Sequence, residues 1–141
     1  MAVRTIDHAA VLRSAGLKAT KDRLVLLEHL HDTRYPLGIP ELKSWGRKHG
    51  VDTVTLYRTL ESLKKAGLVK RTDLQHGHAE YELSYDREHH HHIVCVGCGE
   101  IENIEFCPEQ KLLSGVLSSA TRFTSLSDHA IEFFGTCVSC A

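Results

Sequence analysis

The sequence lacks any long apolar segment. In its 141 residues no hydrophobic run approaches the roughly 18 residues of a membrane-spanning helix. The first residues do not show the pattern of a signal peptide, and low-complexity stretches and internal repeats are also missing. We therefore expect a soluble, cytoplasmic protein of one or two small domains with no membrane partner.

The sequence also lacks the motifs of common metal-dependent and nucleophilic enzymes. It contains no HExxH pair, no HxE…PCxxC combination and no nucleophile motif. A catalytic zinc usually keeps an open coordination position beside a general base. We therefore do not expect an enzyme, and a metal-dependent hydrolase that uses the histidines is the less favoured alternative.

Charge is unevenly distributed, although the net charge is only -1. Residues 1–84 contain 14 Lys and Arg against 10 Asp and Glu, whereas residues 85–141 contain 3 against 8. The second part also holds a histidine run and all five cysteines. This asymmetry indicates a nucleic-acid-binding part joined to a metal-binding module.

Two CxxC pairs accompany the histidine run at residues 89–92. The first pair is Cys95 and Cys98, and the second is Cys137 and Cys140. Imidazole and thiolate are the usual ligands of zinc and of borderline transition metals. In a reducing cytosol, paired cysteines are more often metal ligands than disulfides. Because the gap between the pairs is longer than in a compact zinc ribbon, a folded unit must bring the four thiolates together.

Two alternatives to a metal site remain open for these residues. Unrelated pairs of buried or redox-active cysteines would give the same spacing, and an expression tag gives a histidine run, although tags are longer and terminal. The fifth cysteine, Cys107, has no evident partner. We interpret it as a bystander, with a reactive thiol as the alternative.

The basic part has the pattern of several short helices. The expected helices cover residues 6–15, 21–31, 40–49 and 52–66, with glycines following the first and the last two. In the last helix Leu56, Leu60 and Leu63 recur at helical spacing and should face the core. The opposite face should largely consist of Thr55, Arg58, Thr59 and Ser62.

The last two helices are joined at Gly50-Val51 and resemble a helix-turn-helix, whose second helix enters the DNA major groove. Residues 68–72 can pair with residues 79–83 in a β-hairpin, with Gly77 in the turn. Tyr57 as a core residue and Arg58 as a solvated one remain alternatives to a role in DNA binding.

The histidine run can serve two separate sites. If residues 89–94 form a strand, alternate side chains point to opposite faces. His90 and His92 then share one face, and His89 and His91 share the other.

A series of motifs follows in order along the chain. They are AGLKAT at 15–20 with Arg23, TVTLYRTL at 53–60, AGLV at 66–69, YE at 81–82, the segment 89–99, and GTC at 135–137. In this combination the chain resembles the ferric uptake regulator (Fur) family of bacterial metal-responsive repressors over nearly its whole length.

The resemblance implies an α+β protein. A winged helix-turn-helix DNA-binding domain at residues 1–84 is expected to precede an α/β dimerisation domain at 85–141, which carries a four-cysteine zinc site. A hinge is expected near Ser84–Glu88. Members of the family bind AT-rich palindromic operators in double-stranded DNA as homodimers, and metal favours the DNA-competent arrangement.

The resemblance also implies three metal sites. Structural zinc is expected at Cys95, Cys98, Cys137 and Cys140. A sensory site for Fe²⁺ or Zn²⁺, with Mn²⁺ as a further possibility, is expected at Glu82, His90 and His92. An additional site is expected at His89, His91, Glu109 and His129.

The DNA-contacting residues follow in the same way. Tyr57 and Arg58 match the recognition-helix pair of the family, and Lys18 matches a lysine that reaches toward the minor groove. Thr55 could donate to a phosphate or a base edge, or it could simply be solvated.

The chain departs from the family pattern at the sensory site. Pro36 stands where many members have a histidine ligand. Either another histidine takes its place (His29, His31, His76 or His78), or the site has no additional ligand from this part of the chain. His91 stands where some members have Asp, which makes the additional site richer in nitrogen. We expect a repressor of iron- or zinc-homeostasis genes, and an iron-based peroxide sensor of the same family is the alternative.

Overall fold

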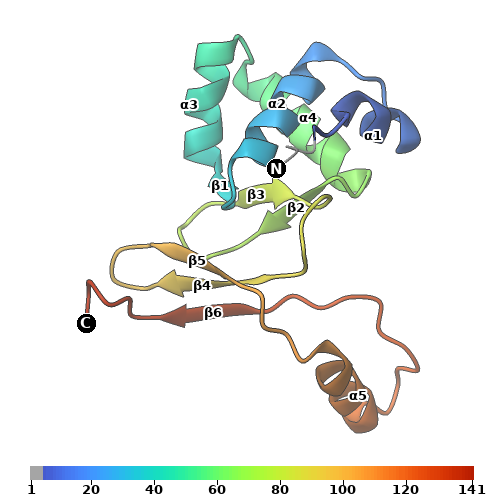
Figure 1. Ribbon diagram of the computed structural model, residues 1–141, viewed down its shortest axis with the longest axis vertical. Helices are drawn as coiled ribbons and strands as arrows, with labels where there is room; N and C mark the ends of the chain where they lie inside the picture. Colours follow the sequence, from blue (N-terminus) through green and yellow to red (C-terminus); the bar gives the residue numbers. More distant parts are fainter. Residues whose placement is uncertain (1–4) are drawn as a thin grey trace. The chain divides into compact units, whose positions relative to one another are not determined.

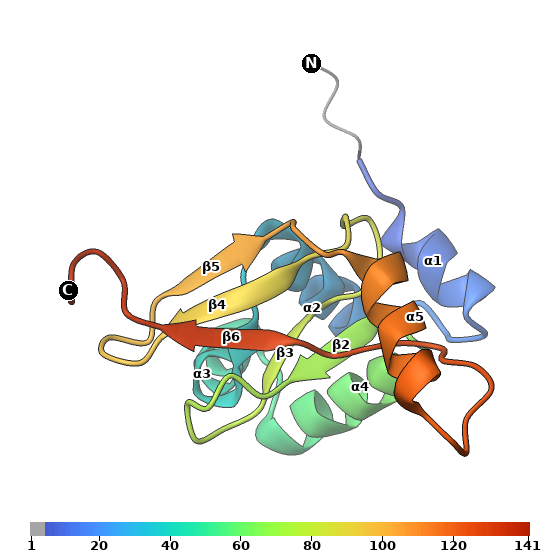
Figure 2. The same ribbon diagram turned by 90° about the horizontal axis from the view of Figure 1, so that it is seen from below.

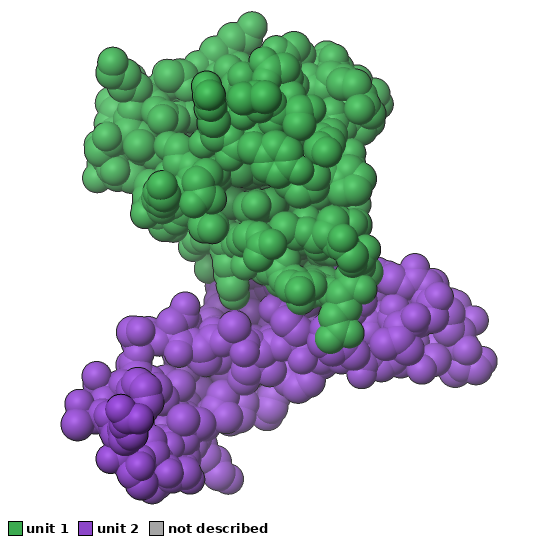
Figure 3. Space-filling view, turned by 180° about the vertical axis from the view of Figure 1, so that it is seen from behind, with its two compact units in different colours: residues 1–87 green, residues 88–141 purple. Residues whose placement is uncertain are grey.

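The computed structural model describes residues 5–141 and separates into two compact units. Unit 1 ends at Arg87 and unit 2 begins at Glu88 (Figure 3). Arg87 itself donates hydrogen bonds of 2.7 Å to the carbonyl oxygens of Leu30 and Thr33. The last residue of unit 1 is therefore held at the end of a helix of that unit. That the units act as a DNA-binding and a dimerisation domain stays a prediction.

The described part of unit 1, residues 5–87, contains four helices (Figure 1). They are α1 (His8–Ser14), α2 (Lys21–Asp32), α3 (Ile39–His49) and α4 (Thr53–Lys65). The side chains of Asp7, Thr20 and Asp52 cap α1, α2 and α4 by accepting a hydrogen bond from the backbone N–H three residues later. Gly50 ends α3 in the left-handed conformation with φ of 72°. These local signals explain why the expected helices are found.

A small antiparallel sheet completes unit 1. Its strands are β1 (Leu37–Gly38), β2 (Val69–Thr72) and β3 (Glu80–Leu83), in the order β1-β3-β2. Strands β2 and β3 form the expected hairpin, which we call the wing. The two-residue strand β1 pairs with the edge of β3 that faces away from β2, and Gly38 lies opposite Glu80.

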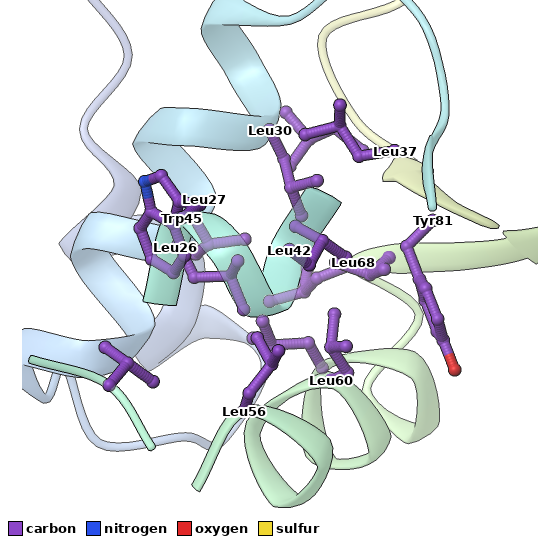
Figure 4. Close-up of a cluster of buried hydrophobic side chains, with 14 of the residues drawn as sticks. Leu26, Leu27, Leu30, Leu37, Leu42, Trp45, Leu56, Leu60, Leu68 and Tyr81 are labelled. Carbon is purple, nitrogen blue, oxygen red and sulfur yellow. The ribbon is translucent and has the colours of Figure 1, made fainter. Parts of the chain in front are cut away.

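Leucine side chains from α1 to α4 and from the wing form the core of unit 1 (Figure 4). Leu56, Leu60 and Leu63 are fully buried, as their helical spacing indicates. Thr59 was expected on the opposite face, and this was wrong because its side chain is only 9% exposed. It lies next to Leu60 on the edge of the face that packs into the core.

Unit 2 is a three-stranded sheet with one helix (Figure 2). Its elements are β4 (His91–Cys95), β5 (Ile101–Ile104), α5 (Glu109–Ser119) and β6 (Glu132–Gly135). Strand β4 is central, antiparallel to β5 and parallel to β6. The parallel pair requires a long crossover, which contains α5. Strand β4 begins at His91, two residues later than the strand that the sequence indicated.

Unit 2 buries little apolar surface within one chain. Its buried apolar side chains among residues 88–141 are Val94 and Cys95. Helix α5 has no buried residue, and Phe106 is 75% exposed. A small unit with so few buried apolar side chains usually needs a metal or a partner subunit to be stable.

The α+β fold class expected from the sequence is confirmed by these elements. No helix within the described part of the chain is long and apolar enough to cross a lipid bilayer.

Candidate metal centres and nucleic-acid interface

The two CxxC pairs meet in unit 2. The Sγ atoms of Cys95, Cys98, Cys137 and Cys140 all lie within 4.8 Å of one another. Cys95 ends β4 and Cys137 follows β6, so the parallel pairing of these strands brings the two turns together. A Cβ added at Gly97 would lie 3.1 Å from Sγ of Cys140, so the first turn approaches the second closely. The folded unit thus provides the expected four-thiolate cluster, whose ligand set fits zinc.

The surroundings of this cluster give its thiols different pKa values. The backbone N–H of Cys137 donates to Sγ of Cys95 over 3.3 Å. This and a second backbone hydrogen bond, from Cys98, lower the pKa of Cys95 to about 6. Hydrogen bonds from its own thiol to the neighbouring sulfur atoms raise the pKa of Cys140 to about 12. A divalent cation is what would allow all four sulfurs to be thiolates together at neutral pH.

The histidine run divides into two pairs as expected. The rings of His90 and His92 lie edge to face with centroids 5.0 Å apart, and those of His89 and His91 with centroids 4.9 Å apart. The alternation of side chains therefore begins before the strand itself.

The pair His89 and His91 belongs to a cluster with His129 and Cys107. Nε2 of His91 is 3.3 Å from Nε2 of His89 and 3.4 Å from Nε2 of His129. Sγ of Cys107 lies 3.5 Å from the same nitrogen of His129. Three imidazole nitrogens and one sulfur therefore converge. Burial lowers the pKa of His91, which favours the neutral ring that metal ligation requires.

The sequence led us to interpret Cys107 as a bystander, whereas the structure places its thiol within this cluster. Glu109 lies on the other side of His129, with its carboxylate 4.0 Å from Nδ1. Nδ1 of His91 lies 3.1 Å from the carbonyl oxygen of Ile131. A carboxylate or carbonyl at the second ring nitrogen orients a metal-binding histidine. Glu109 thus lies at the ring nitrogen of His129 opposite the one near Cys107, whereas the resemblance implied a metal ligand.

The residues expected at the sensory site come from both units. In unit 1, Glu82 lies in β3 opposite Lys70 and its side chain is buried. In unit 2, His92 is buried, and its Nδ1 lies 3.0 Å from the carboxylate of Glu132. This contact fixes the ring orientation of His92.

The histidines considered as replacements at Pro36 have partners within unit 1. His29 stacks on Trp45 with ring centroids 5.0 Å apart. His31 lies 3.7 Å from the carboxylate of Asp86. The remaining two, His76 and His78, lie beside Glu80 at the wing.

The residues expected to contact DNA lie on the surface of unit 1. Lys18 and Arg58 are exposed. Tyr57 is 43% exposed, and the amino group of Lys43 lies 5.6 Å from its ring centroid. Tyr57 is therefore not a core residue.

Thr55 has a local role that its sequence pattern did not indicate. Its hydroxyl donates to Asp52 over 3.0 Å, beside the backbone hydrogen bond of 2.8 Å that caps α4. These two hydrogen bonds lower the pKa of Asp52. A contact from this hydroxyl to a phosphate would have to replace the hydrogen bond to Asp52.

Sequence reasoning missed two ionisable residues beside histidines. Cys107 lies 22 residues from His129, and the sequence pattern indicates only a strand position for Glu80. An HxE pattern at residues 78–80 was a signal for the second, since alternate residues of an extended chain share a face. No local signal identifies Cys107.

Known proteins resemble this chain in sequence and in fold. The sequence profile of the Ferric uptake regulator family matches residues 14–134. The ferric uptake regulation protein of Legionella pneumophila is 33% identical over 139 residues, which cover 96% of this chain and 99% of that protein.

Two solved structures illustrate the likeness in fold. The ferric uptake regulator from Pseudomonas aeruginosa with manganese has a TM-score of 0.73 at 28% identity, covering 94% of this chain and 99% of the other. The ferric uptake regulator from Francisella tularensis with iron has a TM-score of 0.71 at 28% identity, covering 89% and 95%. With these matches and the four-cysteine cluster, the chain belongs to the ferric uptake regulator family of metal-responsive transcription regulators, which are not enzymes.

Proposed function

We propose that this protein is a cytoplasmic, homodimeric repressor that binds AT-rich palindromic operators of metal-homeostasis genes when a regulatory cation is bound. The observation that carries this proposal is the division of the histidine run into two pairs on different sides of the chain. One pair, His89 and His91, belongs to a cluster within unit 2. The other pair, His90 and His92, can ligate a cation at a site whose occupancy follows the metal concentration in the cell.

The regulatory cation is held by Glu82, His90 and His92. Mixed imidazole and carboxylate ligation suits exchangeable Fe²⁺ or Zn²⁺, and also Mn²⁺. The manganese and iron found with the Pseudomonas and Francisella proteins support this range. Glu82 belongs to unit 1 and the two histidines to unit 2. A cation held by all three would therefore restrict how the units move, and so the spacing of the recognition helices in a dimer.

The other two sites have different tasks. Four thiolates at Cys95, Cys98, Cys137 and Cys140 hold a permanent structural Zn²⁺, because closed tetrahedral coordination leaves no open position. The additional site uses His89, His91 and His129, and the thiol of Cys107 makes its donor set nitrogen- and sulfur-rich. Such donors favour zinc over manganese.

The homodimer is supported by the thin core of unit 2. The aromatic rings of Phe106, Phe133 and Phe134 are exposed in the single chain. An exposed apolar surface of this kind is typical of a subunit interface.

DNA binding is assigned to α4 and to the segment before α2. The exposed side chains of Tyr57 and Arg58 project from α4, and Lys18 adds a cation close to the start of α2. Thr55 belongs to the same helix and makes a phosphate contact only by exchanging its bond to Asp52.

The proposal is tested with DNA duplexes that the protein enriches from a random pool in the presence of Fe²⁺, Zn²⁺ or Mn²⁺. Affinity for the enriched duplex is measured with and without added metal, and a random duplex of equal length serves as the non-specific control. We expect metal to strengthen binding of the enriched duplex by about 5–150-fold, the usual range of allosteric coupling.

Two variants locate the regulatory site. His90→Ala should lose most of the metal-dependent gain and keep the structural zinc, the dimer and weak non-specific binding. His91→Ala should have a smaller effect, because its ring belongs to the cluster with His129. An unchanged metal response in His90→Ala, or a larger loss in His91→Ala, would overturn this assignment.

A further inference from the structure

A further group of potential metal ligands lies entirely within unit 1, at the wing. We call His76, His78 and Glu80 the wing cluster. One donor atom from each residue lies within 4.8 Å of the other two. Nδ1 of His76 contacts Oε1 of Glu80, and Nε2 of His78 lies 3.8 Å from the same oxygen. The two imidazoles thus approach one carboxylate.

The carboxylate of Glu80 is buried and incompletely satisfied. Its side chain is only 2% exposed. Among the described residues, its Oε2 has no hydrogen-bond partner, and neither has the buried Nε2 of His76. A buried carboxylate is costly unless its charge is paired and its oxygens are bonded. The hydrogen bond to His76 satisfies one oxygen and leaves the second without a partner.

The backbone of the neighbouring strand leaves room for His78. Gly38 of β1 pairs with Glu80 of β3. A Cβ at Gly38 would overlap the imidazole of His78, since it would lie 2.8 Å from Cδ2 and closer still to Nε2. The absence of a side chain at position 38 therefore allows the His78 ring to lie across β1 and face Glu80.

We propose that the wing cluster is a binding site for a divalent transition-metal cation, with zinc as the best-suited ion. Two imidazoles and one carboxylate are a known zinc ligand set with an open fourth position. Two ligands at about 2.0–2.1 Å from a tetrahedral ion lie about 3.3 Å apart. The separation of 3.8 Å between His78 and Glu80 needs only a small movement to reach this value.

The bound cation joins the loop of the wing to its own sheet. His76 and His78 belong to the loop between β2 and β3, whereas Glu80 is the first residue of β3. Their cross-linking by an ion restricts the tip of the hairpin. Because the fourth position is open, the ion exchanges more readily than one held by four thiolates. This site shares no ligand with the four-cysteine cluster or with the cluster of Cys107.

The test is a count of exchangeable zinc in the full-length protein that retains its structural zinc. Equilibrium dialysis against Zn²⁺ is carried out on the wild-type chain, His78→Ala and Glu80→Gln. Each of the two variants should bind one zinc ion fewer per chain than the wild type. His49→Ala is the matched control, because this exposed histidine of unit 1 lies outside the cluster and bonds to the carbonyl oxygen of Trp45.

A second measurement locates the ion directly. Imidazole ¹⁵N chemical shifts of His76 and His78 should change on addition of Zn²⁺, and the changes should persist in His90→Ala. Trp45 fluorescence shows whether Glu80→Gln remains folded, and if it does not, the partly exposed His78 carries the test alone. Equal zinc stoichiometry in the wild type and His78→Ala, or unchanged shifts of both imidazoles, would overturn the proposal. Neither result depends on whether the protein represses genes.

Discussion

Sγ of Cys107 lies 3.5 Å from Nε2 of His129, on the side where His89 and His91 also converge. This contact changes the donor set of the proposed additional site. A carboxylate ligand would have made the donor set harder, whereas a thiolate makes it softer and better suited to zinc. Glu109 remains close to His129, but at the opposite ring nitrogen.

Replacing Cys107 by Ser should therefore weaken zinc binding at the additional site and leave the structural zinc in place. Loss of an outer-shell partner of a metal ligand costs about 10–100-fold in affinity. We expect that range for Glu109→Gln and a larger loss for Cys107→Ser, measured by competition with a chelator of known zinc affinity. The reverse order would show that Glu109 is the ligand and that Cys107 is not.

Replacing Cys98 by Ser should lower zinc content and thermal stability together. Structural zinc contributes about 10–16 kcal/mol of apparent binding free energy, which is comparable to the whole stability of a domain. Ser139→Ala is the matched control, because this exposed residue lies in the second CxxC turn and is not a ligand. Zinc analysis and calorimetry measure the two effects, and full zinc retention in Cys98→Ser would contradict the four-cysteine assignment.

Lys18 and Tyr57 should have distinguishable effects on DNA binding. Lys18→Ala should weaken binding to operator and random DNA alike and reduce the salt dependence, because it removes one cation from the interface. Tyr57→Ala should reduce discrimination between the two DNAs by about 1–3 kcal/mol if its ring contacts base edges. Affinities at several salt concentrations separate the cases. Equal losses on both DNAs for Tyr57→Ala would limit Tyr57 to backbone contacts.

Unit 1 should lose stability as the pH falls below about 6.5, the ordinary pKa of histidine. Burial lowers the pKa of His8, whose Nδ1 contacts the hydroxyl of Tyr85 over 2.6 Å. The unfolded chain therefore takes up a proton at a higher pH than the folded chain does. The stabilisation is present above the unfolded pKa and is lost as the pH falls through the folded pKa.

Denaturant unfolding followed by the fluorescence of Trp45, the single tryptophan, reports this change for unit 1. His8→Gln should flatten the pH dependence without removing it, because burial also lowers the pKa of His29. An equally steep dependence in His8→Gln would show that other groups control the acid sensitivity.

The helices and the wing could be predicted because their signals are local. Asp52 caps α4, Gly50 ends α3, and three leucines recur along one face of α4. Strand β1 could not be predicted, because two residues are too few to show an alternating pattern. Its partner Glu80 lies more than forty residues further along the chain.

The metal clusters were predictable to different degrees. The four cysteines are recognisable by their paired spacing, and alternation alone separated His90 and His92 from their neighbours. The place of Cys107 depends on the crossover between β5 and β6, which returns the chain to His129. No sequence pattern specifies how that crossover lies, so the sequence alone could not place Cys107 beside His129.

Because aromatic rings of unit 2 are exposed in the single chain, the stability of this unit should depend on protein concentration. A unit with so few buried apolar side chains gains much of its stability by association, and such stability rises with protein concentration. Unit 1 has its own leucine core and should unfold at the same denaturant concentration whether the protein is dilute or concentrated. On dilution, unit 2 should therefore unfold first, and newly made chains should complete their second unit only after they have met a partner.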